Sequence, residues 1–260
     1  MAAMQGAFVW YELMTSDPAA ATAFYTQVAG WTAADSGMPG MQYTLVSAGP
    51  SQVAGIMALP DEARAMGAVP GWEGYIAVAD VDAAAARIAA AGGKTYRPPA
   101  DIPGVGRFAV MADPQGATFM LFRGATGDAR PAATPGTPGH VGWQELHAGD
   151  GPSAFAFYAG QFGWEKHEAM DMGPMGVYQL FGLAGSGNVS TGGMMTKTPE
   201  TSRPHWLYYF NVEAIDAAVA RIASAGGKVV HGPQEVPGGS WIVNAVDPQG
   251  AMFALVAPKR

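Results

Sequence analysis

Two glutamates are the residues of this sequence best placed to do chemistry. Glu12 lies in the strand-like segment FVWYEL, two residues after Trp10. Glu145 lies in the similar segment VGWQEL, two residues after Trp143. Because side chains alternate along a strand, each glutamate shares a face with its tryptophan. Burial there would raise the carboxyl pKa and suit the group to general-base catalysis or to holding an amine. The alternative is a structural carboxylate, half-solvated or hydrogen-bonded to a backbone amide or the indole.

Two histidines add to the chemistry near the second glutamate. His205 begins a strand-like segment four residues before Tyr209, and an imidazole close to Glu145 would form an acid–base pair with it. The alternative for His205 is a surface position at a loop–strand junction. His147 follows Glu145 by two residues, and this Glu-x-His pair is a weak metal-binding signal because no third ligand accompanies it.

The positions of these residues are set by an internal repeat. VDAAAARIAAAGGKTY at 81–96 returns as IDAAVARIASAGGKVV at 215–230, and DPQGATFMLF at 113–122 returns as DPQGAMFALV at 247–256. An offset of 133–134 residues also matches Glu12 with Glu145, and it places Gly71 opposite His205. The sequence therefore predicts two homologous domains of about 130 residues each.

Each half divides again into two modules with the pattern βαβββ. Asp17 and Pro18 predict the start of the first helix, as a capping carboxylate followed by a proline in the first turn. One buried face of that helix is predicted by the spacing of Ala21, Phe24, Tyr25 and Val28. A second helix over 82–91 is expected, with Asp82 as its N-cap and Gly92-Gly93 as its C-terminal stop. The Asp-Pro-Gln-Gly segments predict turns between strands.

Composition limits the classes of protein and partner. The 260 residues are 49% hydrophobic and 13% charged, which suits a chain with a sizeable core. A net charge of −7 with scattered basic residues argues against a nucleic-acid partner. The lack of cysteine excludes a disulfide framework, a thiolate nucleophile and a cysteine-ligated metal. Because we find neither a signal peptide nor a run of 18 apolar residues, we expect no membrane partner and a cytoplasmic location.

A segment rich in glycine, proline, alanine and threonine separates the two halves. It has no apolar periodicity, which is typical of a semi-extended linker. We therefore expect domains at 1–124 and 140–260, joined by a linker at 125–139. The four modules would satisfy their pairing within one chain, which is compatible with a monomer.

Taken together, the motifs resemble those of the vicinal oxygen chelate superfamily, which includes glyoxalase I, extradiol dioxygenases, fosfomycin-resistance enzymes and bleomycin-binding proteins. The resemblance lies in Glu-Leu-x-x-x-Asp, Phe-Tyr, Gly-Trp, Val-Asp-Ala…Gly-Gly-Lys and Asp-Pro-Gln-Gly-x-x-Phe, and it covers nearly the whole chain outside the linker. More narrowly, the chain is similar to the two-domain glyoxalase-like "hydroxylase" proteins of bacteria. The resemblance implies an α+β fold with a tandem pair of domains. In each domain, two βαβββ modules would form an eight-stranded open cup with ligand bound inside.

The resemblance also implies where a metal would be held, and the usual ligands are missing there. The matching positions of the first half are Trp10, Tyr75 and Met120, and those of the second are Trp143, Tyr209 and Ala254. A fourth position falls near Gly55–Met57 and Gly193–Met195, with no carboxylate or imidazole. Tryptophan and methionine do not bind hard divalent metals, and tyrosine is an uncommon ligand. We therefore expect no metal in the usual positions and no cofactor. Five of these side chains are interpreted as ligand-binding walls: Trp10, Tyr75, Trp143, Tyr209 and Met120.

Two classes of function stay open at this point. The first is an enzyme, a lyase or isomerase for a small apolar or carbonyl compound, with Glu12, Glu145 and His205 as its catalytic residues. The second is a non-catalytic protein that sequesters a small molecule, as the bleomycin-binding members do. Loss of the metal ligands favours the second class, whereas the glutamate–histidine candidates favour the first.

Overall fold

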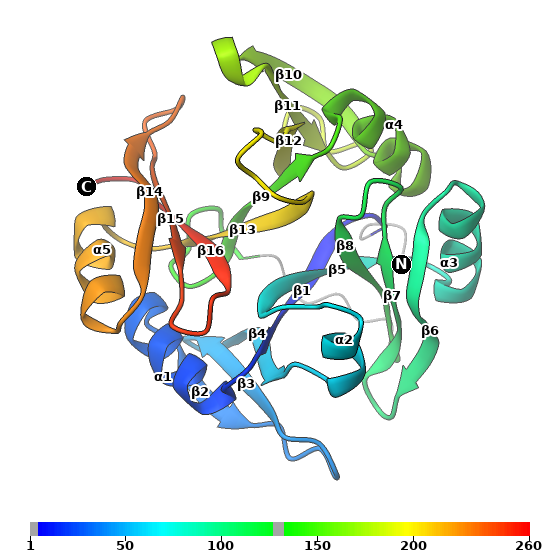
Figure 1. The fold of residues 1–260 in the computed structure, drawn as a ribbon, viewed down its shortest axis with the longest axis horizontal. Coiled ribbons are helices and arrows are strands. Elements are labelled where there is room, and N and C mark those ends of the chain that lie inside the picture. Colours follow the sequence, from blue (N-terminus) through cyan, green and yellow to red (C-terminus); the bar gives the residue numbers. More distant parts are fainter. Residues whose placement is uncertain (1–4, 127–132) are drawn as a thin grey trace. The chain divides into compact units, whose positions relative to one another are not determined.

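The order of strands and helices repeats four times along the chain (Figure 1). The computed structural model describes residues 5–126 and 133–260. The first half contains β1 (Phe8–Thr15), α1 (Pro18–Ala29), β2 (Thr32–Asp35), β3 (Tyr43–Ala48), β4 (Ser51–Ala58), α2 (Asp61–Ala65), β5 (Gly71–Ala77), α3 (Val81–Ala90), β6 (Lys94–Ile102), β7 (Gly106–Ala112) and β8 (Thr118–Gly124). The second half contains β9 (Val141–Ala148), α4 (Gly151–Phe162), β10 (Glu165–Asp171), a 3-10 helix (Gly173–Met175), β11 (Val177–Gly182), β12 (Gly192–Thr196), β13 (His205–Asn211), α5 (Ile215–Ser224), β14 (Lys228–Glu235), β15 (Trp241–Val246) and β16 (Met252–Ala257). These elements confirm the predicted βαβββ modules, and the short helix α2 is an addition that the sequence pattern did not predict.

The strands form two eight-stranded sheets with the same internal order. One runs β2-β3-β4-β1-β5-β8-β7-β6, and the other runs β10-β11-β12-β9-β13-β16-β15-β14. In both sheets the first strand of a module pairs in parallel with its last, and the remaining pairs within a module are antiparallel. The sheets are open rather than closed barrels, which confirms the predicted α+β fold. The middle of the predicted linker, residues 127–132, lies outside the described residues.

The helix starts follow local capping chemistry, with one correction to the sequence reading. Asp17 caps α1 as predicted, because its Oδ1 accepts a hydrogen bond of 3.0 Å from the backbone nitrogen of Ala20. The start expected at Asp82 is wrong. Asp80 has the extended backbone of a cap and accepts from the nitrogen of Ala83 at 3.0 Å. Asp82 lies inside the first turn and instead forms an ion pair with Arg107.

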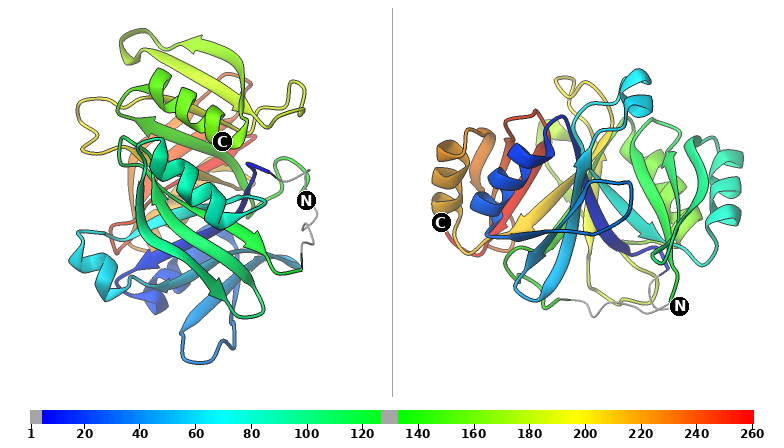
Figure 2. Two further views of the ribbon diagram at one scale, coloured as in Figure 1. Left: turned by 90° about the vertical axis from the view of Figure 1, so that its right-hand side faces the viewer. Right: turned by 90° about the horizontal axis from the view of Figure 1, so that it is seen from below.

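The structure divides into two compact units that do not coincide with the two halves of the sequence. Among the described residues, unit 1 comprises residues 5–10, 74–126 and 144–206, and unit 2 comprises residues 11–73, 133–143 and 207–260. The second and third modules thus supply most of unit 1, and the first and fourth modules supply most of unit 2. In unit 1, helix α3 packs on β6–β8 and also contacts α4 (Figure 2).

The core of unit 1 is organised around a buried tyrosine of α4. Tyr158 donates a hydrogen bond of 3.2 Å to Oδ2 of Asp113 and accepts one of 3.0 Å from the indole of Trp206. Oδ1 of Asp113 also accepts from two backbone nitrogens of its own turn, which confirms the turn predicted at Asp-Pro-Gln-Gly. Burial raises the pKa of Asp113, and these hydrogen bonds oppose that shift. The aspartate therefore ties the β7–β8 turn to α4.

Unit 2 contains the same arrangement built from the other two modules. Tyr25 of α1 donates a hydrogen bond of 3.1 Å to Oδ2 of Asp247, and the indole of Trp72 donates one of 2.9 Å to the tyrosine oxygen. Burial raises the pKa of both Tyr25 and Asp247. The four residues predicted to form the inner face of α1 are buried, with Tyr25 and Phe24 packed against Phe253. The duplication has thus preserved the core network as well as the strand order.

Candidate functional site

A cluster of ionisable side chains in unit 1 begins with Glu145 on β9. In the parallel register of β9 and β12, Glu145 lies opposite Gly193. The ring of Tyr178 from β11 occupies the space over this glycine, because a Cβ built on Gly193 would lie 2.3 Å from ring carbons. The glycine lets the tyrosine reach the glutamate, and its hydroxyl donates a hydrogen bond of 2.8 Å to Oε2 of Glu145.

The other carboxylate oxygen of Glu145 holds a histidine of the same strand. Nε2 of His147 lies 2.8 Å from Oε1 of Glu145, and the two side chains are 17% and 13% exposed. Alternation along β9 puts both on one face, which makes this contact available to residues two positions apart. A carboxylate acceptor places the proton of a neutral imidazole on Nε2 and leaves Nδ1 as a base. This is the relation between an orienting carboxylate and a catalytic histidine.

His205, at the start of β13, stacks on His147. The ring centroids are 4.9 Å apart and the planes meet at 10°. Nδ1 of His205 lies 3.1 Å from the carbonyl oxygen of Arg203, whereas Nε2 is buried and has no hydrogen-bond partner among the described residues. Burial, with a smaller contribution from His147, lowers the pKa of His205 to about 4. His205 is therefore neutral at physiological pH.

The structure thus brings together the predicted candidates Glu145 and His205, with a third residue between them. The sequence reading paired Glu145 with His205, but it is His147 that contacts the carboxylate. The sequence suggests His147 only as half of a metal pair, whereas the structure shows it as an imidazole bound to a carboxylate. The contact could have been predicted from the Glu-x-His spacing, because it puts both side chains on one face of the strand. That spacing suggests metal binding, but it equally suits a carboxylate that orients an imidazole. The other partner of the carboxylate, Tyr178, carried no signal that linked it to Glu145.

The matching place in unit 2 keeps the carboxylate but not the imidazoles. Glu12 is buried, with 6% of its surface exposed, and lies opposite Gly55 in the register of β1 and β4. Tyr43 covers Gly55 as Tyr178 covers Gly193. Where the second half has His147 and His205, the first has Met14 and Gly71. The tyrosine–glycine–glutamate frame is therefore duplicated, and the histidines belong to one copy.

The residues predicted as ligand-binding walls are buried or half-buried strand residues. In unit 1, Tyr75 on β5 and Met120 on β8 are register partners and are both buried, and Trp10 is half-buried. In unit 2, Tyr209 pairs with Ala254 in the same way, and the half-buried Trp143 packs against this cluster. The structure does not test whether any of them contacts a ligand.

The metal implied by the family resemblance does not fit these residues. The family's ligand positions hold tryptophan, tyrosine, methionine and alanine, none of which is a usual ligand for divalent metals. At the fourth position, Tyr43 and Tyr178 fill the space that any side chain on Gly55 or Gly193 would need. Within residues 5–126 and 133–260, no group of three His, Cys, Asp or Glu side chains has a geometry suited to a metal ion.

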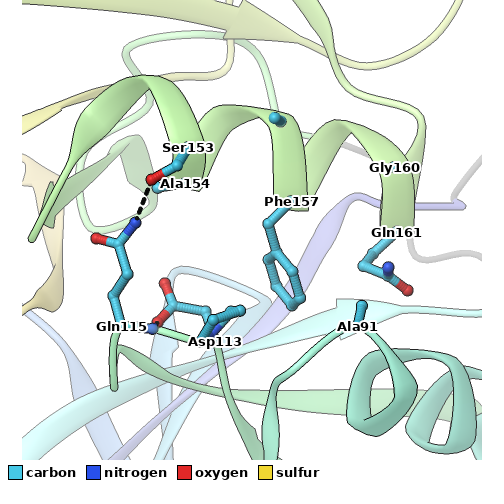
Figure 3. A pocket seen from close by; sticks show the side chains of 10 residues that line it. Ala91, Asp113, Gln115, Ser153, Ala154, Phe157, Gly160 and Gln161 are labelled. Carbon is cyan, nitrogen blue, oxygen red and sulfur yellow. Dashed lines mark hydrogen bonds between the residues drawn. The ribbon is translucent and has the colours of Figure 1, made fainter.

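A separate cavity of about 400 Å³ lies in unit 1, between α4 and the turn after β7 (Figure 3). Phe157 points toward this turn, and Gln115 donates a hydrogen bond of 2.9 Å to Ser153 at one end. Gln161 lies at the other end, beside Ala91. None of the predicted site residues lines this cavity.

The fold and the duplicated modules define a known class of protein, and sequence comparison identifies it. The chain belongs to the glyoxalase/bleomycin resistance protein/dioxygenase superfamily, whose family model matches residues 7–121 and 137–255. No helix in the described part of the chain is long and apolar enough to cross a membrane.

Particular relatives share the whole two-domain chain. "Putative glyoxylase CFP32" from Mycobacterium tuberculosis is 33% identical over 261 residues, which cover 98% of this chain and 95% of the relative. The anthracycline biosynthesis protein DauV from Streptomyces sp. is 34% identical over 267 residues, with 96% and 93% covered. Among solved structures, the Mn(II)-bound glyoxalase from Novosphingobium aromaticivorans has the same fold, with a TM-score of 0.64, 18% identity and coverage of 98% and 82%.

Proposed function

We propose that the chain is a proton-transfer enzyme, an isomerase or lyase, that acts on a small carbonyl compound without the usual metal. The observation that carries the proposal is the contact of 2.8 Å between Oε1 of Glu145 and Nε2 of His147. It supports His147 as the general base and Glu145 as the group that orients it. Tyr178 supports the same roles, because its hydrogen bond fixes the second carboxylate oxygen.

The proposed step is removal of a proton from the carbon next to a carbonyl group. Nδ1 of His147 takes the proton, and the electron pair of the broken C–H bond moves toward the carbonyl oxygen, which gives an enolate. Glu145 stabilises the imidazolium that forms, as a carboxylate does in other carboxylate–histidine pairs. Return of the proton to another atom gives an isomer, and expulsion of a leaving group from the neighbouring carbon gives an elimination product.

The class of substrate is proposed from the relatives and from the residues of the family's ligand positions. DauV is named as an anthracycline biosynthesis protein, which favours a flat aromatic carbonyl compound. Aromatic and thioether side chains such as Tyr75, Met120 and Tyr209 would suit such a ligand. We further propose that the protein acts as a monomer in the cytoplasm, which sedimentation and cell fractionation would test.

Sequestration without catalysis is the second candidate, and a specific observation favours it. The positions where the family holds a metal carry side chains suited to apolar contacts, and unit 2 keeps Glu12 without an imidazole. Under this reading both glutamates, Glu12 and Glu145, contact the bound compound and neither reacts.

Proton exchange separates the two candidates. The purified protein is incubated in D₂O with a panel of aryl methyl ketones, and loss of the methyl signal is followed by NMR. We expect exchange with the native protein and with Met14→Gln, which changes the position equivalent to His147 in the first half. We expect its loss in His147→Gln. Ligand binding without exchange in the native protein would support sequestration and contradict the enzyme.

A further inference from the structure

We propose that Nε2 of His205 accepts a hydrogen bond from a hydroxyl group of the ligand, so that the substrate is a hydroxyl-bearing carbonyl compound. The inference rests on the proposed function, because it places the substrate at the cluster of Glu145, His147 and His205. It goes further by giving His205 a role in specificity rather than in proton transfer.

The backbone sets which nitrogen of His205 carries the proton. The carbonyl oxygen of Arg203 lies 3.1 Å from Nδ1, and a carbonyl oxygen can only accept a hydrogen bond. Nδ1 of His205 is therefore the protonated nitrogen, and in the neutral ring Nε2 carries a lone pair. Nε2 can therefore only accept a hydrogen bond. A hydroxyl or N–H group of a ligand can donate to it, whereas a carbonyl oxygen cannot.

The surroundings keep the ring neutral, so that Nε2 stays an acceptor. The ring of His205 stacks on that of His147 with the centroids 4.9 Å apart, and two positive charges in such a stack would repel each other. Burial lowers the pKa of His205 further, to about 4, against the weaker opposing effects of the Arg203 carbonyl and Glu145. At neutral pH this imidazole therefore cannot donate from Nε2 to a developing oxyanion.

The need for a partner makes Nε2 selective. It is enclosed and has no hydrogen bond within the described residues. A buried acceptor that stays unpaired costs roughly 1–3 kcal/mol, which is about a fivefold to 150-fold change in an equilibrium constant. A site with such an acceptor rejects a ligand that lacks the matching donor. A methyl ether in place of the hydroxyl would therefore bind less well, since it fills the space without donating.

His205 and His147 divide the work in this proposal. His147 binds Glu145 through Nε2, and in the proposed step its Nδ1 takes the proton. The two rings are stacked and nearly parallel, so the hydroxyl-accepting nitrogen and the base belong to neighbouring side chains. The first half has Gly71 at the place of His205, so no such preference is expected from unit 2.

The test uses four compounds: 3′- and 4′-hydroxyacetophenone and the two matching methoxyacetophenones. Calorimetry measures Kd, and NMR in D₂O measures exchange of the ketone methyl protons. For the native protein we expect at least one hydroxyl compound to bind about tenfold more tightly than its ether. His205→Phe, which retains a stacking ring, should remove this difference, and His205→Gln, which retains an acceptor oxygen, should restore part of it.

The control is His231→Phe, which removes an exposed imidazole of β14 and should leave the preference unchanged. Equal binding of hydroxyl and methoxy compounds by the native protein, binding of none of the four, or a preference that survives His205→Phe would overturn the inference. His147→Gln should lower the rate of exchange by about 10²–10⁴-fold while the hydroxyl preference in Kd remains. If the native protein prefers the hydroxyl compounds but shows no proton exchange, the proposed enzyme function is contradicted and the role of His205 in ligand selection is supported.

Discussion

Glu145 of unit 1 and Glu12 of unit 2 have the same tyrosine and glycine arrangement beside them but different residues at the two histidine positions. In both, a tyrosine crosses a glycine that lies opposite the carboxylate on the next strand. Glu145 holds His147, which stacks on His205, whereas Glu12 has Met14 and Gly71 at those places. The comparison teaches that the duplication kept the tyrosine, the glycine and the glutamate in both copies. Only one copy has imidazoles beside the carboxylate positions, and these supply the proposed base.

The largest expected effect is the fall in proton-exchange rate when the proposed base, His147, is replaced. His147→Gln should lower the rate of proton exchange by about 10²–10⁴-fold, the usual contribution of a general base. Met14→Gln, the same change in the copy without histidines, should leave the rate within about twofold of the native protein. Exchange rates followed by NMR check both. Equal losses in the two variants would mean that the two copies do not differ in the way proposed.

Removal of the orienting charge should have a smaller effect. Glu145→Gln keeps the shape of the side chain but cannot stabilise the imidazolium. We expect a loss of up to about a hundredfold in exchange rate, as for a misplaced catalytic group, with little change in Tm. Glu12→Gln is the matched change in the other copy. If Glu145→Gln lowers Tm and leaves exchange and ligand affinity unchanged, the carboxylate is structural.

The two buried tyrosines provide a comparison in which we expect no difference. Tyr158→Phe leaves Oδ2 of Asp113 and the indole of Trp206 without their partner, and Tyr25→Phe does the same to Asp247 and Trp72. Each should lower the free energy of unfolding by about 1–3 kcal/mol. Denaturant titration measures both. A large cost in one variant and none in the other would show that the duplicated networks are not equivalent.

The last expected effect is a pH dependence that His205 adds and that the first half, with Gly71 at the matching place, does not. The folded-state pKa of His205 is about 4, below the usual value of 6.5, so the unfolded chain binds more protons between these two values. Stability should therefore fall as the pH is lowered from 6.5 to 4. His205→Phe should show a weaker fall than the native protein in Tm measured over this window. Burial raises the pKa of Asp113 and Asp247, but that contribution is present in both proteins and cancels in the difference. A steeper fall in the variant would reverse the assigned sign.

The sequence predicted what depends on local pattern and on the repeat. The modules, the cap at Asp17 and the Asp-Pro-Gln-Gly turns each follow from a few neighbouring residues and are confirmed. The second helix start was placed two residues late because Asp80 and Asp82 are both good caps, and only the backbone conformation distinguishes them.

The sequence predicted two residues of the candidate site, but it did not predict which side chains touch each other. Glu145 and His205 were singled out, but the ring that touches the carboxylate is that of His147. The contact of Tyr178 with Glu145 depends on the register of β9, β12 and β11 and on a missing side chain at Gly193. Strand register across a sheet is set by packing of distant segments, and one sequence alone does not reveal it.

The pairing of modules also bears on how the chain folds during synthesis. Tyr158 and Asp113 are 45 residues apart in the sequence, whereas Tyr25 and Asp247 are 222 apart. The core of unit 1 can therefore close once α4 and β13 have left the ribosome. The core of unit 2 has to wait for the last strands, because its tyrosine is made early and its aspartate late. Contacts between residues so far apart in the sequence form slowly. A nascent chain that lacks the later segment exposes apolar surface until that segment is synthesised. The nascent first module, with Phe24 and Tyr25 still uncovered, is thus the segment that we expect to be most prone to aggregation and most in need of chaperones.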